Sequence, residues 1–168
     1  MATQNSTLTQ DQVKSLFDYK DGNLYWKNKT TNLSRVKINA IAGSTGKKGY
    51  LQIGINQKLY LAHRVIFLMH HGYMPDFVDH IDGNKENNFI ENLREASRGQ
   101  NRMNSKLQLN NKSTIKNVNW HKKQNKWVVQ LGVEGKKLYF GAYFDLNVAK
   151  FVAETMRHKY HKQFARSV

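Results

Sequence analysis

The spacing of apolar residues along the chain predicts short helices alternating with short strands. A helical pattern follows Thr9, which forms a capping-box sequence with Gln12, and a second helical pattern covers residues 62–71. Two pairs of strand-like runs, separated by turn residues, predict hairpins over residues 19–26 and 50–61. The first part of the chain is therefore expected to mix helices with antiparallel strands.

The last third of the chain predicts a small sheet covered by one helix. Strand-like runs cover residues 118–121, 126–133 and 136–143, and every second residue of the middle run is apolar. Asp145 can cap a helix whose apolar side chains fall on one stripe. We therefore expect a three-stranded antiparallel sheet with one face packed on the helix and the other face open.

The run from Val78 to Asn104 carries the side chains with the most chemistry. The pair Asp79-His80 ends a predicted short strand, turn residues follow, and residues 92–96 can form a returning strand. Ser97 is a good N-cap for a short helix. A carboxylate, an adjacent histidine and amide side chains at fixed distances are what a metal-dependent hydrolase of phosphodiesters needs.

The net positive charge of the chain indicates a negatively charged binding partner. Lys and Arg number 27 against 12 Asp and Glu, which gives a net charge of +15, so we expect a polyanion, and nucleic acid first. Residues 105–168 carry 13 basic and 3 acidic side chains, whereas residues 61–104 carry 5 and 6. The acidic side chains therefore collect where a cation would bind.

The absence of cysteine excludes disulfides and thiolate zinc sites. No apolar run reaches about 18 residues and the first residues lack an apolar signal core. We expect a soluble, cytoplasmic protein that is not secreted and has no membrane partner.

The run from Val78 to Asn104 resembles the catalytic unit of the HNH endonucleases, which is a ββα-metal fold. The matching residues are Asp79-His80, Asn92 and Asn101, and twelve and nine residues separate His80, Asn92 and Asn101. These separations are close to those of the phage homing endonucleases in that family, and the resemblance extends back to about Asp18. The third motif position is often His; an Asn there favours an oxygen-liking ion, Mg²⁺ or Mn²⁺, over zinc.

This resemblance implies hydrolysis of DNA phosphodiester bonds. His80 would act as general base, because an imidazole is largely neutral near pH 7. Asp79 and Asn101 would give oxygen ligands to one divalent ion, and Asn92 would fix the loop and help to orient the histidine. Four arginines could contact phosphates: Arg64, Arg94, Arg98 and Arg102. Solvation at the surface is the alternative for the last three.

Residues 113–164 resemble the plant ethylene-response-factor (Apetala-two) DNA-binding domain, which is also found fused to phage HNH nucleases. The matching stretches are 117–123, 126–131 and 138–145. In that family the open face of the sheet enters the major groove of DNA. The plant domain has Arg at several contact positions, so its base preference is not carried over. The candidates for DNA contact are Asn119, His121, Lys122, Gln130, Lys137 and Tyr139.

These observations together predict an α+β protein with two domains. We expect a disordered lead-in over residues 1–10, an HNH nuclease domain over 11–104, a linker over 105–112 and a DNA-binding domain over 113–168. Residues 28–48 predict a polar, basic loop that lies along DNA or in solvent.

Two functions follow from this organisation. The first is a phage-type HNH or homing endonuclease that nicks or cuts duplex DNA as a monomer, in the cytoplasm of the host, with no small-molecule substrate. The alternative is a non-catalytic, sequence-specific DNA-binding regulator in which the C-terminal sheet contacts DNA.

Overall fold

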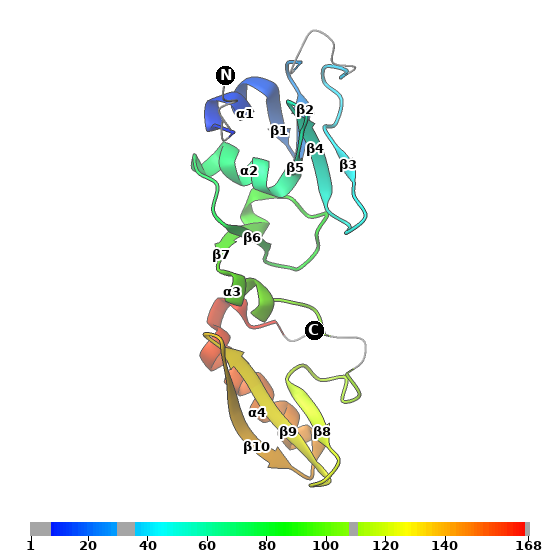
Figure 1. Cartoon of the computed structure of the whole chain (residues 1–168), viewed down its shortest axis with the longest axis vertical. Coiled ribbons are helices and arrows are strands. Elements are labelled where there is room, and N and C mark those ends of the chain that lie inside the picture. The colour runs from blue at the N-terminus through cyan, green and yellow to red at the C-terminus, as the bar shows by residue number, and fades with distance from the viewer. Residues whose placement is uncertain (1–7, 30–35, 108–110, 167–168) are drawn as a thin grey trace, which may run out of the picture. The chain divides into compact units, whose positions relative to one another are not determined.

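The chain forms two compact units, Met1–Glu95 and Ala96–Val168. The computed structural model describes residues 8–29, 36–107 and 111–166, and Figure 1 labels its elements. Both units combine helices with small sheets, so the α+β class predicted from the sequence is confirmed. Within the described residues, no helix has the length and apolar character needed to span a membrane.

The first unit contains a two-stranded sheet of β1 and β2, a three-stranded sheet in the order β3-β4-β5, and the strand pair β6-β7. Helix α2 contacts α1, β4, β5 and β6, and therefore joins the sheets into one core (Figure 1). The elements are α1 (Gln10–Leu16), β1 (Phe17–Lys20), β2 (Asn23–Trp26), β3 (Ser44–Thr45), β4 (Leu51–Ile55), β5 (Lys58–Leu61), α2 (Ala62–His71), β6 (Phe77–His80), the 3-10 helix η1 (Ile90–Asn92) and β7 (Leu93–Ala96).

Local sequence signals explain these elements. The predicted hairpins are confirmed, with turns at Asp21-Gly22 and Asn56-Gln57 whose central residues all have positive φ. Helix α2 ends where Gly72 adopts the left-handed conformation, at φ 80°. The fully buried side chains at the centre of this unit are Val13, Phe17, Leu24, Ile53, Val65 and Ile66.

The start of the described chain is more ordered than the predicted lead-in over residues 1–10. Thr9 caps α1, and its side chain and that of Gln12 form the expected reciprocal capping box. Leu8 and Val13 are both buried, and they occupy the two positions of a hydrophobic staple around this cap. Order therefore begins inside the predicted lead-in; residues 1–7 lie outside the described part of the chain.

Part of the predicted loop over residues 28–48 belongs to the sheets. Trp26 N donates to Ala40 O at 3.0 Å, Ala42 N donates to Leu24 O at 2.7 Å, and β3 then pairs with β4. Gly43 has φ +100°, and a Cβ there would lie 2.5 Å from the backbone oxygen of Gln52, so only glycine allows this close approach. Residues 30–35 lie outside the described part.

The second unit contains the predicted three-stranded antiparallel sheet, in the order β10-β9-β8, with α4 along one face (Figure 1). Val118, Val129 and Leu131 of the sheet pack with Ala149 and Ala153 of α4. The elements are α3 (Arg98–Met103), β8 (Val118–His121), β9 (Lys126–Val133), β10 (Lys136–Tyr143), α4 (Leu146–His161) and the 3-10 helix η2 (Lys162–Phe164).

The boundary between the units precedes the linker predicted over residues 105–112. It falls between Glu95 and Ala96, so α3 belongs to the same unit as the C-terminal sheet, whereas β6 and β7 belong almost entirely to the first. Residues 108–110 of the predicted linker lie outside the described part.

We predict that Leu131→Ala lowers the free energy of unfolding of the second unit by about 2–5 kcal/mol, because it leaves a cavity between the sheet and α4. Tyr139→Ala is the matched control: Tyr139 is 59% exposed, and its loss should cost less than about 0.5 kcal/mol. Urea unfolding followed by tryptophan fluorescence measures both values. Equal losses for the two variants would contradict the packing described here.

Candidate active site

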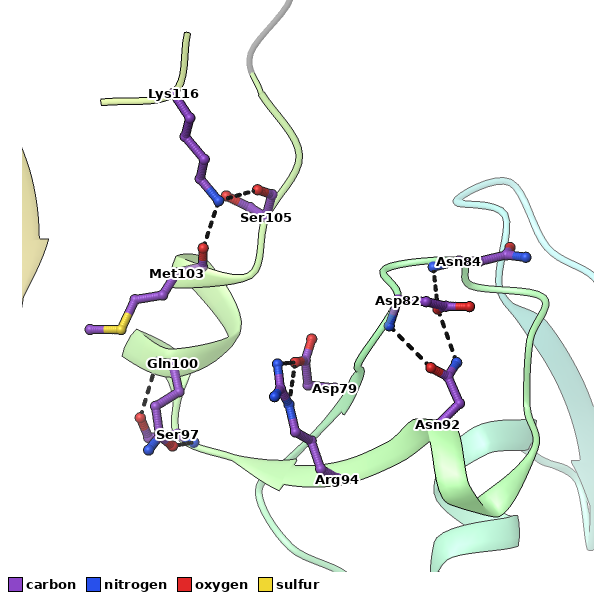
Figure 2. A network of polar contacts seen from close by, with 10 residues as sticks. All are labelled: Asp79, Asp82, Asn84, Asn92, Arg94, Ser97, Gln100, Met103, Ser105 and Lys116. Atoms are coloured by element: carbon purple, nitrogen blue, oxygen red, sulfur yellow. Dashed lines mark hydrogen bonds and ion pairs between the residues drawn. The ribbon is translucent and has the colours of Figure 1, made fainter. Parts of the chain in front are cut away.

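Strand β6 places two ionisable residues side by side in the interior of the first unit. Asp79 is 5% exposed and His80 is 4% exposed. A buried carboxylate costs several kcal/mol unless it is paired, and β7 provides the partner. Nε and Nη2 of Arg94 both donate to Oδ2 of Asp79, at 2.9 and 2.8 Å (Figure 2). The paired strands β6 and β7 therefore carry both the buried carboxylate and the guanidinium that neutralises it.

Asn92 closes the loop that follows His80. Its Oδ1 accepts from the backbone N of Asp82 at 3.0 Å, and its Nδ2 donates to Oδ1 of Asp82 at 2.9 Å (Figure 2) and to the backbone O of Asn87 at 2.8 Å. The backbone N of Ile81 also donates to Asn92 O. Burial opposes the charge of Asp82, but the hydrogen bonds from Asn84, Asn87 and Asn92 outweigh it and lower the pKa of Asp82. The loop is thus held by a dense set of polar contacts.

The ring of His80 is oriented by Asn88. His80 Nε2 lies 2.9 Å from Asn88 Oδ1, and Asn88 is 3% exposed. Because an amide oxygen only accepts, Nε2 carries the proton of this bond, and Nδ1 of a neutral ring is then the nitrogen that can accept a proton. Sequence reasoning missed Asn88, which is one of three asparagines in the loop that Asn92 closes.

Two further rings lie beside His80, His63 from the start of α2 and Tyr50 from before β4. The His63 ring centroid is 4.8 Å from that of His80, and the Tyr50 centroid is 5.3 Å from His63 and 6.1 Å from His80. Burial, followed by the charges of His80 and Arg64, lowers the pKa of His63 to about 3. Burial, followed by the charge of Asp79, raises the pKa of Tyr50. Near neutral pH both rings are therefore uncharged neighbours of His80.

Sequence reasoning did not identify Tyr50. No local pattern marks Tyr50, because it reaches the histidines only through the fold.

The arginines predicted to contact phosphates fall into two groups. Arg94 pairs with Asp79, and Arg64 donates from Nη1 to Asp76 O at 2.6 Å and from Nη2 to Pro75 O at 2.8 Å, which holds the segment before β6. Arg98 and Arg102 are exposed and stand one turn apart on α3, so they share a face of the helix. Contact of any of these side chains with DNA stays a prediction.

Helix α3 carries Asn101, the second predicted metal ligand. A capping box begins the helix: Ser97 Oγ accepts from Gln100 N at 3.2 Å, and Gln100 Oε1 accepts from Ser97 N at 2.7 Å (Figure 2). The first unit thus brings together Asp79, His80, Asn92 and Arg94, whereas Asn101 belongs to the second. An ion shared by Asp79 and Asn101 therefore stays a prediction.

The register of the C-terminal sheet places most of the predicted DNA contacts on one face. Residues opposite one another in antiparallel strands point to the same side, and the pairs are Asn119 with Val128, His121 with Lys126, Gln130 with Tyr139, and Lys137 with Gly132. This face lies opposite the side of β9 that packs on α4, so it is the open one. Lys122 lies exposed in the turn after β8.

Comparison with known proteins defines the class. A family model described as HNH endonuclease matches residues 60–103, a segment that runs from the end of β5 through α3 and contains Asp79, His80, Asn92 and Asn101. The chain therefore carries an HNH endonuclease domain.

One relative is a phage protein. The chain is 37% identical over 90 residues to "Protein 3.8" of Escherichia phage T7, a match that covers 54% of this chain and 74% of that protein. The chain belongs to the same family as that phage protein. No solved structure gives a significant match.

We predict a pH dependence of stability from His63. Its pKa is about 3 in the folded chain against 6.5 as the ordinary value, so between these values the unfolded chain binds more protons and stability falls as the pH falls. Above pH 6.5 this contribution is complete. His80, Tyr50 and Arg64 surround the ring and offer no negative charge to a protonated His63.

The measurement compares urea unfolding of the wild type and His63→Gln at pH 7 and pH 4. The wild type should lose about 2–3 kcal/mol more than the variant over this range. Parallel losses in the two proteins would show that His63 is not held neutral by the fold.

Proposed function

We propose that the chain is a metal-dependent endonuclease that hydrolyses phosphodiester bonds of duplex DNA. The observation that carries this proposal is the buried pair Asp79-His80, which is held by polar contacts from Arg94 and Asn88. A purely structural role would be served better by apolar side chains of similar volume. The HNH endonuclease domain over residues 60–103 supports nuclease activity and DNA binding.

His80 is the general base of the proposed reaction. Its Nε2 is held by Asn88, so Nδ1 takes a proton from a water molecule as the water oxygen attacks phosphorus, and the bond from phosphorus to the 3′ oxygen breaks. His63 is neutral beside it and therefore does not oppose the positive charge that His80 gains. Asn92 keeps the loop after His80 closed, which fixes the strand end that carries the base.

Asp79 and Asn101 fit a hard divalent cation, Mg²⁺ or Mn²⁺, as oxygen ligands. The described residues contain no group of three or more His, Cys, Asp or Glu that could hold a metal, so water and DNA phosphate oxygens would fill the other positions, as Mg²⁺ prefers. When bound, the ion would polarise the phosphate and stabilise the leaving 3′ oxygen. Because Asp79 already pairs with Arg94, the carboxylate would be shared with the guanidinium or released by it.

Basic side chains of both units would bind the DNA backbone. Arg98 and Arg102 are exposed on one face of α3, which suits contact with adjacent phosphates. Arg64 and Arg94 are engaged within the protein, so a phosphate contact by either would depend on exchange of those bonds.

The open face of the C-terminal sheet is proposed to hold the DNA. Residues 105–168 carry 13 of the 27 basic side chains, and the register places polar, basic and aromatic side chains together on that face. A sheet of this kind can read bases in the major groove while its lysines contact phosphates. The groove-reading candidates are Asn119, His121, Gln130, Lys137 and Tyr139, with Lys122 at the edge.

The similarity to a phage protein supports a phage-type HNH or homing enzyme. We propose that it acts on DNA in the cytoplasm of its host, as a monomer. Cleavage could be a nick or a cut of both strands, and both products are read in the same assay.

We predict that His80→Ala lowers the rate of cleavage of supercoiled plasmid in Mg²⁺ or Mn²⁺ by at least about 100-fold, because the general base is lost. DNA affinity in EDTA should stay within about twofold, since a neutral side chain adds little to a salt-dependent interaction. His158→Ala, an exposed histidine of α4, is the control and should cut normally. Retardation of DNA by a wild-type protein that cuts no plasmid in either ion would instead support the non-catalytic DNA-binding regulator.

We predict that Lys137→Ala weakens DNA binding and lowers the slope of log affinity against log salt by about 1, as expected for one lost phosphate contact. The matched control is Lys150→Ala, because Lys150 is exposed on α4, the helix that covers the other face of the sheet. Fluorescence anisotropy across a salt series measures both. Equal effects of the two substitutions would show that DNA does not bind preferentially to the open face.

A further inference from the structure

Helix α3 carries a proposed metal ligand but cannot hold its own position. It has six residues, and none of its side chains is buried. A helix this short is not stable alone in water, and no apolar face fixes it against a core. The capping box of Ser97 and Gln100 fixes its first turn. Its C-terminal end needs a separate contact.

Lys116 closes the C-terminal end of α3. Its Nζ donates to the backbone oxygens of Met103 and Ser105, both at 2.6 Å (Figure 2). Carbonyls at this end of a helix lack partners within the helix, and a positive charge there is favourable. Lys116 is 8% exposed, so these bonds are largely shielded from water.

The C-terminal fold in turn holds Lys116. Nη1 of Arg157, a residue of α4 that is 1% exposed, donates to the backbone oxygen of Lys116 at 2.7 Å. Helix α3 also lies against η2, which follows α4. A continuous series of contacts therefore runs from α4 through Lys116 to the end of α3.

The burial of Lys116 is costly for the fold. Burial, followed by the charges of Arg157 and Arg166, lowers the pKa of Lys116 to about 8, so near pH 7 the amine stays mostly protonated and has three N–H donors. An apolar side chain at this position would avoid the desolvation of an ammonium group. Such a replacement would, however, lose the hydrogen bonds that the lysine donates at the end of α3.

We propose that Lys116 is a positioning residue for the nuclease reaction: it fixes α3 on the fold of the second unit and thereby sets the position of the Asn101 amide. This inference rests on the proposed role of Asn101 as a metal ligand. The C-terminal sheet and its helix then serve the chemistry as well as DNA binding.

The test uses the full chain with Lys116→Met, which keeps an unbranched side chain but removes every donor, and with Lys112→Met as a control that removes one exposed lysine of the same segment. In Lys116→Met the amides of residues 98–104 should exchange with solvent about tenfold faster, while those of β9 should not change. Lys112→Met should match the wild type at both places.

Cleavage at saturating DNA should fall about 10- to 100-fold in Lys116→Met, because a displacement near 1 Å of a ligand is sufficient for such a loss. The Mn²⁺ concentration for half-maximal cleavage should rise, and DNA affinity in EDTA should stay within about twofold. Lys116→Arg, which keeps the positive charge and N–H donors, should recover part of the rate. Unchanged exchange of α3, or cleavage at the wild-type rate, would overturn the inference.

Two results separate this inference from the proposed function. If the wild-type protein cuts no DNA, the nuclease proposal is wrong. Amide hydrogen exchange of α3 in Lys116→Met then still shows whether the lysine fixes the helix. If Lys116→Met does not fold, Lys116→Gln, which retains one shorter amide donor, is measured in its place with the same expected pattern.

Discussion

The first unit depends on the neutralisation of one buried carboxylate. Asp79 lies in the interior beside His80, and without the guanidinium of Arg94 its charge would destabilise the fold strongly. This requirement explains why β6 and β7 pair where they do, since β7 presents the arginine to the aspartate. Asn88 in turn hydrogen-bonds to the buried ring of His80, and Asn92 closes the loop that follows the pair. This cost falls at the place where we propose a general base and a metal ligand.

Most elements of the fold could be predicted from the sequence because their signals are local. The capping boxes at Thr9 and Ser97 fix the starts of α1 and α3, and the strands of the second unit follow from alternation between turn residues. Residues 36–45 gave no such signal, since backbone hydrogen bonds rather than side chains attach them to β2 and β4. A pattern of apolar positions cannot report contacts of that kind.

Some residues of the candidate site could be predicted from the sequence and others could not. Asp79, His80, Asn92 and Asn101 could be found because their spacing along the chain matches a known family. The partners that orient and compensate them could not be predicted, because they depend on which side chains the fold brings together. Tyr50 and His63 approach His80 from distant parts of the sequence, and Arg94 was expected on a phosphate rather than on Asp79.

The lysine at the end of α3 bears on how such nucleases exchange parts during evolution. The family model covers residues 60–103, whereas the ammonium group that closes the helix belongs to residue 116. A chimaera that joined residues 60–103 to an unrelated recognition module would therefore inherit the helix with the proposed metal ligand but not the lysine that holds its end. An active chimaera would need another hydrogen-bond donor for the carbonyl oxygens at the end of this helix. Fusion of the two segments alone would not transfer the activity.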